Sequence, residues 1–202
     1  AFYNACREAG IKPIIGCEVY VAKGSRYDRS GSGESDYNHL LLLVKNEVGY
    51  KNLIYMVSKA FTEGFYRKPR IDLELLSAHS EGLIALSACL AGYIPRQIIN
   101  GNLEAAEEYA LKLDNIFGSG NFYLELQDQG IDGQRMVNEC IAGISERTGI
   151  PMVATNDVHY LRKEDAKIQS VMMCIQTNSM VSDGRHAGFE TDEFYLKNAD
   201  EM

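Results

Sequence analysis

The sequence predicts an α/β fold in which short apolar strands alternate with amphipathic helices. Three observations indicate it: continuous apolar runs, helix-length segments with apolar residues at helical spacing, and glycines that directly follow those segments. Strands separated by helices of this length are typical of βα units, which build a parallel sheet or a barrel. Because no exact repeat and no long linker divides the 202 residues, we expect one domain.

The first half of the chain is expected to form two helices and two strands around a loop. The loop, residues 24–38, is rich in Gly, Ser and Asp. Apolar residues at helical spacing predict the second helix, and a continuous apolar run predicts a buried strand before it. The expected segments are a helix at 3–9, strands at 12–22 and 40–44, and a helix at 47–62 with Leu53, Ile54, Val57 and Phe61 on its apolar face.

The second half repeats the order of strand and helix. Gly118 and Gly149 end two of the expected helices, as C-terminal glycines do. From about Ser179 this alternation is lost. The expected strands are 82–86, 122–126 and 151–156, and the expected helices are 102–118, 133–149 and 163–177.

Composition limits the classes of function. Twenty basic and 28 acidic residues give a net charge of −8, which argues against a main DNA-holding surface because such surfaces are usually basic. The five cysteines are odd in number and show no CxxC spacing, so we expect reduced thiols in a cytoplasmic protein. No apolar run approaches the length of a membrane span, and no membrane partner is expected. The chain opens at Ala1 directly into a helical pattern, which suggests a piece of a longer protein.

The segment TNDVHY at 155–160 is the most informative for chemistry. Asp157 and His159 follow an expected strand, and active sites of βα folds are built at the carboxyl ends of strands. Alternate residues there project the same way, so this D-x-H pair can present a carboxylate and an imidazole to one metal ion. The alternative is an Asp that begins the next helix and a His that caps its end.

Three further residues are candidate metal ligands. Glu18 lies in the apolar segment GCEVYV, where a buried carboxylate requires a partner, although it can instead face solvent. Cys89 follows the strand GLIAL, where a thiolate can complete a metal site, although a buried Cys is more often a small apolar residue. His39 precedes LLLLV, which is the wrong end of a simple parallel strand.

One basic cluster could contact phosphates. Two aromatic residues precede Arg67, Lys68 and Arg70. This pattern has two interpretations, contacts to nucleic acid and a solvated loop. His79 and His186 are in polar stretches and are expected at the surface. Neither GxGxxG, a P-loop nor a G-x-S-x-G nucleophile motif is present.

Long segments of the chain resemble one family. AGIKPIIGCEVYVA, HLLLLVKNEVGYKNL, FTEGFYRKPRIDLELL, GLIALSACLAG, MVATNDVHYLRKEDA and FETDEFYLK are similar, in this order, to the PHP (polymerase and histidinol phosphatase) domain of bacterial DNA polymerase III alpha subunits. The resemblance implies a distorted (β/α)7 barrel of the PHP type, incomplete here at its N-terminal strands. It also implies that residues 1–178 are a partial PHP domain and that 179–202 lead into the polymerase palm region.

The resemblance implies a ligand set as well. Family members hold two or three metal ions, and onto this sequence their ligands fall at Glu18, His39, Cys89, Asp157 and His159. The family's H-x-H and D-H motifs precede the segment with which this chain begins. Relatives often have His where this chain has Gln129, which is a departure from the pattern.

The implied function is that of a replicative DNA polymerase. The metal site, with zinc, manganese or iron, would serve 3′–5′ exonuclease or pyrophosphatase chemistry. Magnesium would belong to the palm domain, and the implied partners are DNA, a proofreading exonuclease subunit and a sliding clamp. The alternatives are a structural docking module for the proofreading subunit and a free-standing PHP phosphatase.

Overall fold

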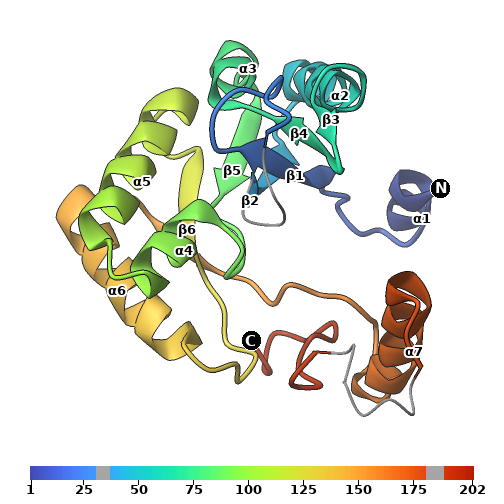
Figure 1. Cartoon of the computed structure of the whole chain (residues 1–202). Coiled ribbons are helices and arrows are strands. Elements are labelled where there is room, and N and C mark those ends of the chain that lie inside the picture. Colours follow the sequence, from blue (N-terminus) through green and yellow to red (C-terminus); the bar gives the residue numbers. More distant parts are fainter. Residues whose placement is uncertain (31–36, 181–188) are drawn as a thin grey trace.

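The strands of the protein pair into one mixed sheet. The computed structural model describes residues 1–30, 37–180 and 189–202, and within these ranges the strand order is β3-β4-β1-β2-β5-β6-β7 (Figure 1). The strands are β1 (Gly16–Ala22), β2 (Tyr37–Val44), β3 (Phe65–Tyr66), β4 (Lys68–Ile71), β5 (Leu83–Leu86), β6 (Phe122–Leu126) and β7 (Met152–Ala154). The predicted α/β class is confirmed. A closed barrel is not, since no ladder within the described ranges joins β3 to β7.

Helices lie beside the sheet in two groups. The first group is α2 (Glu47–Thr62) and α3 (Leu73–Ala78), and the second is α4 (Tyr93–Ile99), α5 (Leu103–Phe117) and α6 (Gln134–Thr148). Figure 1 shows the first group near β1–β4 and the second near β5 and β6. The helix α1 (Phe2–Glu8) and the pair η2 (Lys163–Asp165) and α7 (Ala166–Thr177) stand apart from the sheet. None of the helices in the described part of the chain has the length and apolar character to cross a membrane.

The direction of β2 differs from the expectation. β2 is antiparallel to both of its neighbours, β1 and β5, whereas β1 is parallel to β4, and β5, β6 and β7 are mutually parallel. The expectation of a simple parallel sheet is therefore wrong at β2, because buried strands of either direction consist of continuous apolar residues. As a result, the first residues of β2 lie at the sheet edge where β1 and β5 end.

The hydrophobic core lies between the sheet and the helices. Leu42 of β2, Phe122 of β6 and Met56 of α2 are fully buried there. Within α2 the predicted apolar face is partly wrong, because Ile54 and Phe61 are exposed. The residues of α2 that are buried are Gly49, Leu53, Met56 and Ala60.

Two glycines set how closely α2 approaches the sheet. A Cβ atom on Gly49 would lie 1.8 Å from the carbonyl oxygen of Gly82, which directly precedes β5. Gly82 itself has φ +74°, a conformation that glycine adopts without steric cost. The first turn of α2 is also capped, since the Asn46 side chain accepts a hydrogen bond from Gly49 N at 3.1 Å. This junction therefore holds α2 against the start of β5.

Candidate metal centre

The sheet register places Glu18 and His39 on one face. Side chains alternate along β1, so Glu18 and Tyr20 point the same way, while Val19 and Val21 are buried in the core. Tyr20 pairs with His39 across the antiparallel ladder, and Glu18 pairs with Leu41. His39 is therefore a diagonal neighbour of Glu18 on that face. Because β2 runs antiparallel, its first residues are at the carboxyl end of β1, which explains how His39 reaches the site.

Cys89 completes a compact cluster with these two residues. One ligand atom from each of Glu18, His39 and Cys89 lies within 4.8 Å of the others. The Nδ1 atom of His39 is 2.9 Å from Glu18 Oε1 and 3.9 Å from Cys89 Sγ. Cys89 lies just beyond the end of β5, after Ala88, whose φ of 65° is left-handed. This conformation turns the chain at the strand end, and strained backbone of this kind gathers at functional sites.

Asp157 and His159 lie beyond the end of β7 and face the same cavity. The cavity has a volume of about 500 Å³. Its lining consists of Glu18, Leu41, Ala88, Cys89, Glu125, Gln127, Thr155, Asn156, Asp157, Val158 and His159. Four of the five predicted ligands therefore line one space. The fifth, His39, contacts Glu18 from beside the cavity, whereas Asp157 and His159 are not part of the 4.8 Å cluster. Asp157, like Ala88, has a left-handed backbone conformation, with a φ of 46°.

The hydrogen bonds of His159 fix which ring nitrogen is free. Its Nδ1 atom lies 2.6 Å from the carbonyl oxygen of Asp157, and a carbonyl oxygen can only accept. Nδ1 therefore carries the proton, and Nε2 has the lone pair that can bind a metal ion. The ring is held by Phe189 and Phe194, whose centroids lie 4.5 Å and 5.4 Å away.

The acidic groups of the cavity have pKa values shifted in opposite directions. The hydrogen bond from His39 lowers the pKa of Glu18 below its usual value. Burial raises the pKa of Asp157, and it raises that of the Cys89 thiol to about 12. Three carboxylates, a thiol and the His159 imidazole thus line one space, and the nearby negative charges of Asp157, Glu18 and Glu125 add to the rise in the Cys89 pKa. A cation would neutralise this set.

The donor atoms fit a divalent transition metal. Imidazole nitrogen, carboxylate oxygen and thiolate sulfur are the ligands that zinc, manganese and iron sites combine. The cluster of Glu18, His39 and Cys89 is small enough for one ion to contact all three residues. Asp157 and His159 extend the same donor types along the cavity.

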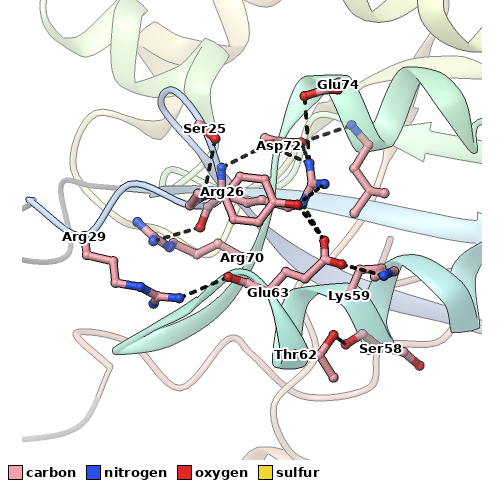
Figure 2. Close-up of polar contacts among 12 residues, drawn as sticks. Ser25, Arg26, Arg29, Ser58, Lys59, Thr62, Glu63, Arg70, Asp72 and Glu74 are labelled. Atoms are coloured by element: carbon pink, nitrogen blue, oxygen red, sulfur yellow. Dashed lines mark hydrogen bonds and ion pairs between the residues drawn. The ribbon is translucent and has the colours of Figure 1, made fainter.

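The three basic residues differ in their surroundings. Arg67, at the turn between β3 and β4, is exposed, and the Lys68 ammonium lies 5.5 Å from the Tyr20 ring centroid. Arg70 is only 3% exposed, and its guanidinium donates to the backbone carbonyls of Gly64 and Asp28. It also donates to the carbonyl of Arg26 (Figure 2). Arg70 thus anchors the segment after β1 and does not face solvent as a nucleic-acid contact would.

Other predicted positions fall outside the centre. His79 is partly buried at the end of α3, with Nδ1 3.4 Å from Asn52 Oδ1. Gln129 is fully buried and its side chain contacts Gln134, away from the cavity lining. His186, expected at the surface, lies outside the described residues.

Glu125 is a residue of the cavity that the sequence pattern did not single out. It lies in β6 and is 4% exposed. Burial raises its pKa. A charged residue inside the apolar strand FYLEL is the same signal that pointed to Glu18, and applied here it would have identified Glu125 as well.

Comparisons with known proteins give one family and one group of relatives. The PHP domain family matches residues 1–129, which include Glu18, His39 and Cys89. The whole chain also aligns with DNA polymerase III alpha subunits of Treponema pallidum (48% identical over 202 residues), Borreliella burgdorferi (46% over 203) and Thermus aquaticus (45% over 203). These alignments cover 100% of this chain but only 17%, 18% and 17% of the three relatives. The chain thus spans less than a fifth of their length.

Proposed function

Because the chain belongs to the PHP domain family, we propose that it is the PHP domain of a bacterial replicative DNA polymerase, the DNA polymerase III alpha subunit, with a metal-dependent phosphoesterase site. The observation that carries the proposal is the convergence of Glu18, His39 and Cys89 within 4.8 Å. The similarity along the whole chain to alpha subunits supports the polymerase assignment. On this view residues 1–178 belong to the PHP domain, with the barrel of its family, and 179–202 lead toward the palm.

Each side chain of the centre has a distinct task. A bound divalent ion, whether zinc, manganese or iron, would activate water for attack on a phosphoester. Glu18, Cys89 and His39 would hold it, and Asp157 and the Nε2 atom of His159 would supply donors across the cavity. Lys68, near the Tyr20 ring, and Arg67, near the Tyr66 ring, would contact phosphates of the substrate. The natural substrates are a primer 3′ end or pyrophosphate, and DNA, magnesium and the sliding clamp would be bound by other parts of a cytoplasmic polymerase.

The catalytic proposal is tested on the intact protein. Asp157→Ala and His159→Ala are expected to abolish release of nucleotides from a mismatched 3′-labelled primer in the presence of manganese or zinc, while primer extension continues. Asp132→Ala, at an exposed position away from the cavity, is the matched control. Full nuclease activity in both variants, or no bound metal in the purified protein, would sink the catalytic version.

A second function, a docking module for a proofreading subunit, is favoured by α7. Ile168, Met172 and Ile175 of this helix are 62%, 58% and 71% exposed. Apolar residues gathered on one helix mark interaction surfaces. Ile175→Ser is expected to weaken co-purification of the proofreading subunit, whereas Leu111→Ser on α5, where Leu111 is also exposed, leaves it unchanged. Equal capture by both variants would rule out α7 as the docking surface.

A further inference from the structure

A buried carboxylate lies beside the metal centre and has no basic partner among the described residues. Glu125 of β6 is 4% exposed, and no Lys, Arg or His nitrogen of the described chain forms an ion pair with it. Burying a carboxylate is costly unless its oxygens are hydrogen-bonded, so such a group requires an explanation. The explanation lies in what the two oxygens contact.

The carboxylate of Glu125 bridges the two strand ends that carry the ligands. Its Oε2 atom accepts a hydrogen bond from Ala88 N, on the turn that leads to Cys89. Its Oε1 atom accepts from the Thr155 hydroxyl at 2.7 Å, on the segment that leads to Asp157. Both Ala88 and Asp157 have left-handed φ values, which residues with side chains seldom adopt without support. Glu125 is thus the group that supports the Ala88 turn from within the sheet.

Nearby contacts place the carboxylate precisely. Glu125 N donates to the Ser87 hydroxyl at 2.8 Å, and Gln127 Nε2 donates to the Thr155 hydroxyl at 3.2 Å. The ladder pairs Glu125 with Val153, and β6 lies between β5 and β7 in the sheet. β6 therefore separates the turn after β5, which carries Cys89, from the segment after β7, which carries Asp157.

We propose that Glu125 is a positioning residue of the metal centre, which holds the Cys89 turn so that the thiolate reaches the ion shared with Glu18 and His39. The inference rests on the proposed metal binding. It goes beyond it by assigning a role to a residue that is not a ligand. Partners of this kind orient the ligands of metal sites, and their removal costs roughly 10–100-fold in metal affinity.

Cobalt(II) titration of the intact protein tests the proposal, because a cobalt–thiolate bond gives a charge-transfer absorption that reports Cys89 directly. Cys89→Ser assigns the band. Glu125→Met removes both acceptors at similar volume, and it is expected to lower cobalt affinity about 10–100-fold and to shift or abolish the band. Glu125→Gln keeps a carbonyl oxygen for Ala88 N, so it is expected to retain most of the cobalt affinity and most of the charge-transfer band. Glu139→Gln, on the exposed face of α6, is the control.

Each result decides the matter. Unchanged affinity and band in Glu125→Met overturn the proposal, and so does a Gln variant as defective as the Met variant, since the charge would then matter and not the support of the turn. If the Met variant does not fold, Thr155→Val is expected to weaken cobalt binding and Thr155→Ser to restore it, while equal affinities overturn the proposal. Absence of cobalt binding in the unsubstituted protein would instead overturn the proposed site itself.

Discussion

The Nδ1 atom of His39 lies 2.9 Å from the Oε1 atom of Glu18, and this contact crosses from β2 to β1. It exists because the two strands are antiparallel, so that the start of one lies beside the end of the other. The same arrangement brings Cys89, which follows β5, to the pair. Residues from three strands thus meet at one edge of the sheet.

Cys89 is expected to set the metal preference of the centre. Thiolate is a soft ligand that favours zinc over manganese, whereas carboxylate and imidazole bind both. Cys89→Ser should therefore weaken zinc binding by more than about tenfold and affect manganese less. Competition titrations with a metal indicator on the intact protein measure both affinities. Cys140→Ser on α6, which does not line the cavity, is the control. An equal loss for the two metals would contradict a bond between the thiolate and zinc.

Two helical glycines should respond oppositely to alanine. Gly49→Ala places a methyl group against the carbonyl of Gly82, and overpacking of this kind costs about 1–3 kcal/mol. At Gly143 of α6 the nearest atom is the flexible Arg147 Nη1, 3.2 Å from the new Cβ, so Gly143→Ala should stabilise by about 0.5–1 kcal/mol through helix propensity. Urea denaturation measures both. Stabilisation by Gly49→Ala would mean that α2 can move away from β5.

Asn156 should be essential for the attachment of residues 193–195. Its Nδ2 atom donates to the carbonyls of Glu193 at 3.0 Å and Tyr195 at 2.8 Å. Asn156→Ala leaves both acceptors without this partner, at a cost of about 1–3 kcal/mol. Hydrogen exchange should show faster exchange at His159 N, which donates to the Phe194 carbonyl. The exposed Asn102→Ala should leave this exchange unchanged, and the proposed attachment is wrong if both variants behave alike.

The network around Arg26 should give a specific acid dependence. Hydrogen bonds from Lys59 and, to a smaller extent, Tyr27 lower the pKa of Glu63 from 4.5 to about 2. The Nε atom of Arg26 also lies 3.1 Å from the Glu63 carboxylate (Figure 2). A depressed folded-state pKa stabilises the protein above the unfolded value, and this stability is lost as pH falls through the folded value. The difference in unfolding temperature between wild type and Glu63→Gln should thus be full above pH 4.5 and shrink toward pH 2.

A matched variant separates this effect from general acid unfolding. Glu139→Gln removes an exposed pair with Arg135, and such pairs add little to stability. Its unfolding temperature should follow the wild type at every pH. A Glu63→Gln difference that stays constant from pH 6 to the acid limit would show that the ion pairs of Figure 2 do not stabilise the fold.

The sequence predicted the elements whose periodicity is long. The helices at 47–62, 102–118 and 133–149 agree with α2, α5 and α6 to within a residue at each end, because each has four turns or more over which an apolar face repeats. The strands β3 and β4 are two and four residues long, and β4 has the sequence KPRI, which lacks the apolar run that identified β5. The sequence did not indicate the direction of β2 either, and this direction is the reason why His39 reaches Glu18.

The candidate site could be predicted only in part for a related reason. Asp157 and His159 were recognisable because they are neighbours in the sequence, after a strand. Glu18 and Cys89 gained support from the family resemblance, since each is isolated in its own segment. The charge within an apolar strand marks Glu125 as unusual, but its hydrogen bonds reach residues 37 and 30 positions away along the chain, and no local pattern encodes those contacts.

The segment at 193–196 is attached to the turn at 156–160 by one side chain, the buried ring of Phe194 against His159, and otherwise by its own backbone. The carbonyls of residues 193, 194 and 195 and the amide of Leu196 make the backbone contacts. Backbone groups are common to nearly every residue type. Substitutions at positions 193 and 195 should therefore be tolerated during evolution, because they leave these acceptors in place. Insertion or deletion of one residue would displace every acceptor at once, so this segment must conserve its length and, at one position only, the Phe194 ring.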